Sequence, residues 1–206
     1  MTVEPSALTE TNVDANPIRQ FQTWIDEVRA NGVSEQDAIS MTLATAAKTG
    51  EPDARIVLLK SFDDRGFVFY TNYQSRKAKE LSDNPRACLL FYWAQLWRQV
   101  RIEGTVEKAS DEDSDAYFQS RPTGSKLGAW TSNQSEVIAG REVLEVRFAE
   151  LQERFGDNVP RPPHWGGYRV KPNAIEFWQG QENRLHDRLR YRLQQDGSWL
   201  IERLAP

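Results

Sequence analysis

The chain has 206 residues, of which 39% are hydrophobic and seven are tryptophan, a composition typical of a folded protein with a substantial core. Its formal net charge of −4 gives no reason to expect a nucleic-acid or anionic-membrane partner, and its single cysteine excludes an intrachain disulfide and fits a reducing compartment. Because no stretch is apolar enough to span a membrane and the N-terminus lacks a basic-then-apolar signal sequence, we expect a soluble cytoplasmic protein.

The N-terminal part of the chain changes character at residue 16. Residues 1–15 are polar and lack hydrophobic periodicity, so we expect a mobile segment there. Asn16-Pro17 is then typical of a helix start and Asn31-Gly32 of a helix end. Between these signals the apolar residues recur at helical spacing, which predicts a helix that packs on the core through Ile18, Phe21, Ile25 and Val28.

From Met41 onward, short apolar runs alternate with turn signals rich in glycine, proline and aspartate. The pattern predicts strands over residues 41–47, 55–60, 67–71, 86–93, 97–108, 168–171, 174–179, 187–194 and 198–203. It predicts helices over residues 75–83, 110–120 and 136–155. Strands at this spacing, joined by tight turns, indicate an antiparallel barrel. The expected fold is therefore mainly β with flanking helices (α+β), with residues 16–206 forming one domain.

Two groups of cations flank predicted elements in the first half of the chain. Arg55 and Lys60 bracket four consecutive apolar residues, which predicts a strand covered on both faces: Ile56, Val57, Leu58 and Leu59. Ser75, Arg76 and Lys77 begin a predicted helix, where free backbone N–H groups, a hydroxyl and two cations are suited to bind a phosphate. The alternatives are charges that simply project into solvent from the strand and from a capped surface helix.

A second candidate anion site follows the predicted helix over 110–120. Tyr117 and Arg121 are four residues apart and share a face if the segment is helical, with Ser125 just beyond. An aromatic hydroxyl, a guanidinium and a second hydroxyl suit a phosphate monoester, which arginine can bind through two hydrogen bonds. The alternative is a helix that ends in an arginine.

Residues 175–188 combine a strand pattern with spaced basic side chains. Ile175 and Phe177 alternate with Glu176 and Trp178, as in a half-buried strand, and Gly180 breaks the run. Three basic residues follow at intervals of two, and in an extended segment they would share one face about 7 Å apart: Arg184, His186 and Arg188. Such a set favours an anion or an electron-rich ring lying over it, and the alternative is a solvated edge strand.

This segment resembles the C-terminal signature of the pyridoxamine 5′-phosphate oxidase family, flavin enzymes that make pyridoxal 5′-phosphate. The match runs through residues 176–179, 184–188 and 202–206, and the resemblance covers roughly residues 16–206. It implies a split β-barrel homodimer with two flavin mononucleotide (FMN) sites at the subunit interface. The residues that match the family's FMN contacts are Arg55, Ile56, Val57, Leu58, Leu59, Lys60, Tyr70, Thr71, Ser75, Arg76, Lys77, Gln99, Trp178 and Arg188, together with Gln134 and Ser135, which the partner subunit would supply.

The resemblance also implies a reaction, the oxidation of pyridoxine or pyridoxamine 5′-phosphate at the exocyclic C4′ carbon, with hydride transfer to flavin N5 and reduction of O2 to H2O2. Arg184 and His186 match the catalytic residues that lie against the pyridine ring. The residues that match the binding site for the substrate phosphate are Lys60, Tyr117, Arg121 and Ser125. One departure is that residues 1–15 lack the arginines and the tyrosine of the family's N-terminal arm, so we expect looser closure over the substrate.

Two alternatives stay open. A phenazine-pathway-type flavin oxidase of the same fold would act on a bulkier tricyclic substrate, and it would not need Lys60 and Arg121 as a phosphate site. A non-catalytic module that binds flavin or pyridoxal phosphate would not need both Arg184 and His186. Two distant histidines and one cysteine give no metal-binding spacing, and no Gly-x-Gly-x-x-Gly or Walker-type loop is present, so we expect neither a metal nor a Rossmann-type cofactor.

Overall fold

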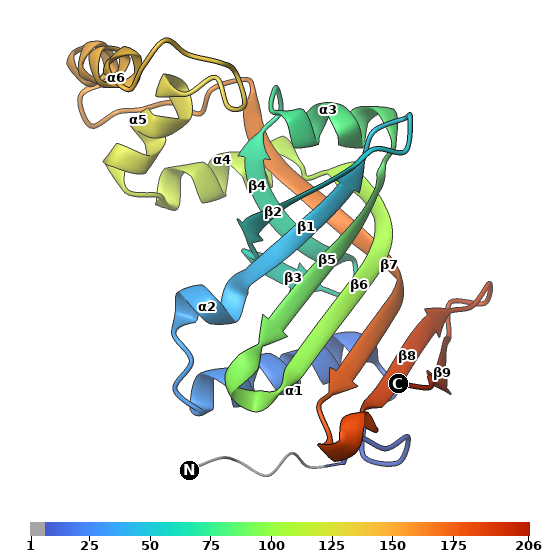
Figure 1. Cartoon of the computed structure of the whole chain (residues 1–206). Coiled ribbons are helices and arrows are strands. Elements are labelled where there is room, and N and C mark those ends of the chain that lie inside the picture. Colours follow the sequence, from blue (N-terminus) through green and yellow to red (C-terminus); the bar gives the residue numbers. More distant parts are fainter. Residues whose placement is uncertain (1–6) are drawn as a thin grey trace.

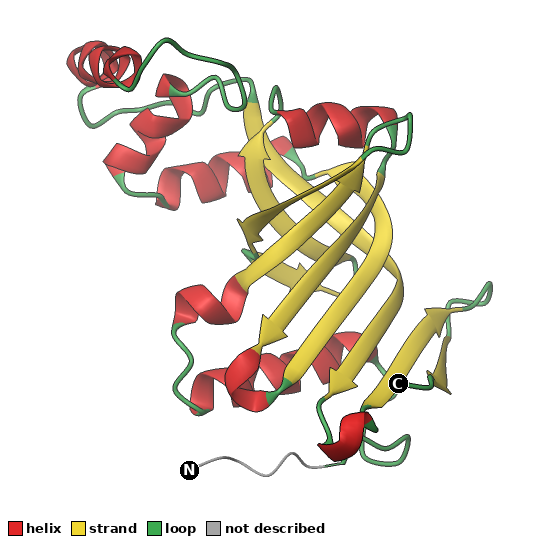
Figure 2. Cartoon of the chain, in the orientation of Figure 1, coloured by secondary structure: helices red, strands yellow, loops and turns green. Residues whose placement is uncertain are grey.

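The computed structural model describes residues 7–206, in which one strongly curved antiparallel sheet has helices at both of its ends (Figures 1 and 2). The sheet has nine strands, ordered β2-β1-β5-β6-β7-β4-β3, and β7 also pairs with β8, which pairs with β9. This confirms the predicted mainly β fold with flanking helices. The strands are β1 (Ser40–Ala46), β2 (Pro52–Leu58), β3 (Ser61–Asp63), β4 (Gly66–Asn72), β5 (Arg86–Trp93), β6 (Arg98–Lys108), β7 (Trp165–Gln179), β8 (Asp187–Leu193) and β9 (Trp199–Arg203).

Strand β7 divides the sheet into the two parts of a split barrel. Along one edge it pairs with β6 from Tyr168 to its end, whereas along the other it pairs first with β4 and then, from Ala174, with β8. The sequence predicted two strands here, over residues 168–171 and 174–179. The chain continues as one strand because the register against β6 shifts between Glu103 and Gly104. A side chain at Gly104 would lie 2.1 Å from the Lys171 carbonyl oxygen, so the close approach requires glycine.

Six helices accompany the sheet in the described residues, and none is both long and apolar enough to cross a lipid bilayer. The short α2 has only five residues, too few for a visible periodicity, and α5 contains two glycines, so neither was predicted. The predicted helix over 136–155 begins only at Glu142. The helices are α1 (Pro17–Ala30), α2 (Glu35–Ile39), α3 (Arg76–Asp83), α4 (Asp111–Ser120), α5 (Thr123–Thr131) and α6 (Glu142–Phe155).

Helix α1 fills the concave side of the sheet. Asn16 caps it by accepting hydrogen bonds from the next turn, and Pro17 occupies its first position, as predicted. The Phe21 ring lies 4.9–5.1 Å from the rings of Phe62, Phe67 and Phe91. This aromatic cluster forms the centre of the main core, so α1 fixes the curvature of the strands that carry the site.

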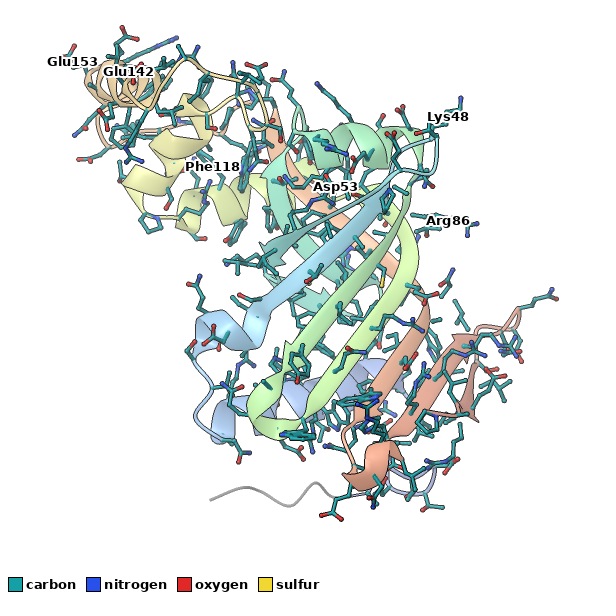
Figure 3. All side chains as sticks on the ribbon, in the orientation of Figure 1. Lys48, Asp53, Arg86, Phe118, Glu142 and Glu153 are labelled. Carbon is teal, nitrogen blue, oxygen red and sulfur yellow. The ribbon has the colours of Figure 1, made fainter. Side chains whose placement is uncertain are left out.

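Helices α4, α5 and α6 form a separate helical lobe (residues 111–155) beyond the ends of β4 and β7 (Figure 1). It has its own small core, in which Phe118 lies between α4 and α5 (Figure 3) together with Leu127, Val159 and Trp165. Helix α6 lies at the outer edge and buries none of its residues in the chain described here. The lobe therefore stands over one end of the sheet and leaves room beneath it.

The described part of the N-terminal segment lies against the C-terminal hairpin. Leu8 is buried and its N–H donates to Asp187, and the Tyr191 hydroxyl donates to the carbonyl of Asp14. The sequence predicted a mobile segment through residue 15. Residues 8–14 instead make specific contacts to β8 and β9, which the polar composition did not indicate, and residues 1–6 lie outside the described residues.

Candidate functional site

A cavity of about 990 Å³ lies beneath the helical lobe, between β2, β4, the start of α3, and helices α4 and α5. Asp53, at the start of β2, lies beneath α3 at this end of the sheet (Figure 3). Most of the residues predicted to bind cofactor or substrate phosphate line the cavity: Arg55, Ile56, Val57, Leu58, Lys60, Tyr70, Thr71, Arg76, Lys77, Tyr117, Arg121, Ser125, Gln134 and Ser135. The structure thus brings together side chains from five separate elements.

Three of the predicted cofactor residues differ from expectation in their exposure or position. Strand β2 is an edge strand that pairs only with β1, and Ile56 is 64% exposed, so the prediction of a strand covered on both faces is wrong for the single chain. Leu59 is buried in the main core and does not line the cavity. Ser75 is also buried, and its hydroxyl donates to the Asn72 carbonyl.

Lys77 is a buried cation at the start of α3. Only 7% of the residue is exposed, and its ammonium donates to three neutral oxygens, those of Gln134 at 2.8 Å and of Thr71 and Ser75 at 3.3 Å. In the described part of the chain it forms no ion pair. Burial, and then the charge of Arg55, lower the pKa of Lys77 to about 8. A buried ammonium without a carboxylate partner, at a helix N-terminus, is suited to a phosphate.

The guanidinium of Arg55, in contrast, is already held by the protein. It donates to Asp53 and Glu80, to the Thr45 hydroxyl and, at 3.1 Å, to the Leu43 carbonyl. Although burial opposes it, hydrogen bonds from Thr45, Arg76 and Arg55 hold the pKa of Glu80 below its usual value.

Sequence reasoning missed both carboxylates of this network. Asp53 and Arg55 share one side of β2 at a spacing of two residues, and Arg76 and Glu80 are four apart on α3, at 2.9 Å. These spacings were the signal that would have found them.

The other end of the cavity is aromatic. The rings of Tyr70 and Tyr117 stack at 4.2 Å, and Trp165 continues the stack at 5.4 Å from Tyr70. The guanidinium of Arg121 lies over the Trp165 ring at 4.7 Å, and the Lys60 ammonium lies over Tyr117 at 5.7 Å. Trp165 was not predicted, because it follows a proline-rich linker and carries no charge pattern.

Arg121 carries a buried nitrogen, Nη1, that has no hydrogen-bond partner in the structure. Burial lowers the pKa of Arg121, since the cation has lost water without gaining a carboxylate. A buried donor without an acceptor costs about 1–3 kcal/mol. An anionic group in the cavity would satisfy it.

Gln134 and Ser135 belong to the same chain as the cavity. The Gln134 side chain accepts from Lys77, and the Ser135 hydroxyl accepts from the backbone N–H of Arg76 at 3.3 Å. The resemblance assigned this pair to a partner subunit. The structure corrects that assignment, because the loop between α5 and α6 folds back onto the start of α3.

Three other predicted cofactor residues form a row on the outer face of the sheet. Gln99 pairs with Trp178 across β6 and β7, and Trp178 pairs with Arg188 across β7 and β8, so the three side chains share one face. One row further along, Glu176 is buried and accepts from Arg188 at 2.8 Å and from Arg101 at 2.6 Å. The apolar/polar alternation predicted that Glu176 faces solvent. In the structure it is buried instead.

Arg184 and His186 lie on a tight turn beside this row. The shared face of the three basic residues required an extended segment. The segment is not extended, because Asn183 and Arg184 have positive φ angles of 54° and 62°. The turn brings the His186 ring to 4.7 Å from the Trp178 ring. His186 and Arg188 thus lie beside Trp178, with the exposed Arg184 on the turn itself, and the three residues do not form a straight line along a strand.

The predicted residues therefore form two groups at opposite ends of the molecule. The cavity group lies between α3 and the helical lobe, whereas the group around Trp178 lies where β7 ends and β8 begins (Figure 1). None of Gln99, Trp178, Arg184, His186 and Arg188 lines the cavity. One chain does not bring the two groups together.

Comparison with known proteins identifies the family. Residues 27–155 match the family model described as pyridoxamine 5′-phosphate oxidase, and residues 165–206 match the pyridoxine 5′-phosphate oxidase C-terminal dimerisation region. The chain is 59% identical to a protein of Cupriavidus metallidurans named pyridoxine/pyridoxamine 5′-phosphate oxidase, with 98% of this chain and 94% of that protein covered. A protein of the same name from Trichormus variabilis is 58% identical, with 97% and 93% covered.

Solved structures agree on the fold. The crystal structure of PhzG from Burkholderia lata in complex with tetrahydrophenazine-1-carboxylic acid is 31% identical, with a TM-score of 0.91 over 99% of this chain and 100% of that chain. A pyridoxamine 5′-phosphate oxidase-related, FMN binding protein from Nostoc punctiforme is 17% identical, with a TM-score of 0.73 over 93% and 98%, and shares the fold. The chain therefore belongs to the pyridoxamine 5′-phosphate oxidase family and is an oxidoreductase of that family.

Proposed function

We propose that this protein is an FMN-dependent oxidase that converts pyridoxine 5′-phosphate or pyridoxamine 5′-phosphate to pyridoxal 5′-phosphate. The names of relatives at 58–59% identity support this substrate class. Bound FMN would supply the chemistry, by accepting hydride from C4′ at N5 and passing the electrons to O2 with release of H2O2. With the amine substrate, water would then hydrolyse the resulting imine to the aldehyde and ammonia. The residues of the chain would bind and orient the substrate and exclude water.

The observation that carries the proposal is the unpartnered Nη1 of Arg121. Lys60, Tyr117 and Ser125 line the same cavity, so a phosphate monoester there would meet two cations and two hydroxyls. The stacked rings of Tyr70, Tyr117 and Trp165 form the wall beside this position. A phosphorylated substrate would accept a hydrogen bond from the buried guanidinium. Because the arginine is already desolvated, binding would remove no further water from it.

The FMN phosphate fits the other end of the cavity. Lys77 is buried among neutral oxygens, and Arg76 lies beside it at the start of α3, so two cations line this end of the cavity at a helix N-terminus. Arg55 would stand behind them, with its guanidinium fixed by Asp53 and Glu80. The cation set is thus consistent with two separate phosphate positions in one cavity.

The site would be completed across a homodimer. A two-fold axis presents the same surface of both subunits, so the group around Trp178 of one chain can cover the cavity of the other. The match of residues 165–206 to a dimerisation region supports this, because Trp178, Arg184, His186 and Arg188 all lie within it. The exposed apolar side chains of Ile56, at the mouth of the cavity, and of Tyr92, in the row of Gln99, are suited to such an interface.

The likeness to PhzG favours one alternative, oxidation of a tricyclic phenazine-type substrate. Such a substrate carries no phosphate monoester, so it would leave Nη1 of Arg121 without a partner.

An absorption spectrum of the purified holoprotein, recorded before and after anaerobic addition of pyridoxine 5′-phosphate, tests the proposal. We expect the flavin band to bleach and to recover in air while pyridoxal 5′-phosphate forms. A flavin band that bleaches only with a reduced phenazine carboxylate would establish the alternative. A flavin band that neither compound bleaches would contradict both oxidase assignments.

A further inference from the structure

The turn that carries His186 fixes the position of the proton on its imidazole ring. The backbone N–H of Gln181 donates to His186 Nδ1 at 3.1 Å. A neutral imidazole has one donor nitrogen and one acceptor nitrogen, so a ring that accepts at Nδ1 carries its proton on Nε2. The positive φ angles of Asn183 and Arg184 close the turn and return His186 to Gln181.

The ring is also fixed in orientation. Its centroid lies 4.7 Å from that of Trp178, with an angle of 47° between the two planes. One edge is thus held by Gln181 and one side is in contact with the indole. In residues 7–206, no protein acceptor lies within hydrogen-bond distance of Nε2. The group left for a ligand is therefore an N–H donor, not a lone pair.

Gln181 is itself anchored by a network that extends to both chain ends. Its side-chain amide donates to Asp187 Oδ2 at 2.8 Å, and the same carboxylate accepts from Arg203 at 2.8 Å and from the Leu8 N–H at 3.1 Å. Arg203 in turn holds Glu10 with two hydrogen bonds of 2.9 Å. The Gln181 side chain thus ties the turn to β8, to β9 and to the N-terminal segment.

We propose that Gln181 is a positioning residue that locks His186 as the Nε2–H tautomer, so that His186 acts as a hydrogen-bond donor to the substrate and not as the base that removes its proton. The second part of the inference rests on the proposed function, in which His186 faces the pyridine ring. A fixed donor costs no reorganisation when charge shifts on a ring oxygen during hydride transfer. A rotating imidazole would offer that donor for only part of the time.

The test replaces Gln181 by methionine, which keeps the side-chain length and removes the amide that donates to Asp187. The matched control is Gln194→Met, since the side chain of Gln194 donates only to the Arg192 carbonyl at the far β8–β9 turn. Nitrogen-15 NMR of histidine-labelled holoprotein reports the tautomer directly, and the chain has only two histidines, so an H164Q variant assigns His186.

We expect a pure Nε2–H signal for His186 in the unsubstituted protein and in Gln194→Met, and a mixture of tautomers in Gln181→Met. For pyridoxine 5′-phosphate, kcat of Gln181→Met should fall by about three- to tenfold, the effect of one hydrogen bond, with KM changed by less than about twofold. An Nδ1–H ring in the unsubstituted protein would overturn the inference, as would a Gln181→Met variant with unchanged tautomer and kcat. A correct tautomer in a protein that does not oxidise pyridoxine 5′-phosphate would overturn the proposed function and uphold the tautomer assignment.

Discussion

Arg121 should lower the stability of the ligand-free protein and raise its affinity for the substrate. A single substitution, measured for both quantities, separates the two effects. Arg121→Met removes the buried Nη1 that lacks a partner and keeps an apolar contact with Trp165 and Phe118. We expect KM for pyridoxine 5′-phosphate to rise by about tenfold or more, because a charge-assisted hydrogen bond is worth about 1.5–3 kcal/mol. The melting temperature of the ligand-free protein should rise by about 2–4 °C for each kcal/mol of relieved desolvation.

The control is Arg86→Met, because Arg86 is exposed, does not line the cavity and points outward from the sheet (Figure 3). It should change neither quantity. An Arg121→Met variant that melts at a lower temperature, or that keeps its KM, would contradict the role given to Nη1.

Lys77 should make the binding of FMN depend on pH. The pKa of its ammonium is lowered to about 8, so above that pH the group loses the charge that attracts the FMN phosphate. That phosphate, with a second pKa of about 6, stays doubly charged over this range. The nearby carboxylates of Asp53 and Glu80 have lowered pKa values and titrate only in acid. We expect the affinity of the apoprotein for FMN, measured by fluorescence titration, to fall by up to about tenfold per pH unit above pH 8.

The stability of the apoprotein should follow the opposite trend. The unfolded lysine, with a pKa of 10.5, binds more protons than the folded one between about pH 8 and pH 10.5, so the contribution of Lys77 to stability rises with pH through that window. Lys77→Met should bind FMN more weakly at neutral pH and show neither trend. The same pH dependence in Lys77→Met as in the unsubstituted protein would assign the effect to another group.

Glu176 on β7 joins the two neighbouring strands, because its carboxylate accepts from Arg101 on β6 and from Arg188 on β8. In Glu176→Gln, one amide oxygen must serve two guanidiniums while the amide N–H groups face a donor. We expect the free energy of unfolding in urea to fall by about 1–3 kcal/mol. The affinity for FMN should fall as well, because Arg188 loses the contact that orients it. Glu107→Gln, on the exposed Glu107–Lys171 pair of the same sheet, should cost less than about 1 kcal/mol. Equal losses in the two variants would refute a special role for Glu176.

The sequence predicted elements well where the signal was local. Strand β5 and helices α1 and α4 agree with their predicted ranges, because apolar periodicity and end signals coincide there. Local signals failed where a distant segment decides the structure. Residues 168–179 were predicted as two strands, yet the register shift at Asn173, against Glu103 and Gly104 of β6, keeps β7 continuous.

The candidate site shows the same limit. Motif positions identified the residues that the cavity brings together, such as Lys77 and Arg121. They did not reveal that Arg55 is bound by Asp53 and Glu80, or that Gln134 folds back onto Lys77 in its own chain. These contacts depend on how loops close over the sheet, and neither spacing nor propensity along the chain records that.

At the scale of the whole molecule, the separation of the two groups of residues makes a composite site testable by mixing subunits. Arg121→Met damages only the cavity group, and Trp178→Ala damages only the group around Trp178. If each site takes one group from each subunit, a heterodimer of the two variants has one intact site and one doubly damaged site. Random exchange of equal amounts makes half of the dimers heterodimers, so we expect about a quarter of the unsubstituted activity to return from two weakly active samples.

The subunits must exchange for this to happen, so the recovery should appear only after a brief dilution or mild denaturation that separates them. Size-exclusion chromatography should show a dimer before and after this step. Mixing Arg121→Met with Lys77→Met, both on the cavity group, is the matched control and should restore nothing. No recovery in the first mixture despite confirmed exchange would mean that each chain builds its site alone and that the group around Trp178 has another role. Recovery in the control would mean that Arg121 and Lys77 of one site come from different subunits, which would contradict a cavity built by one chain.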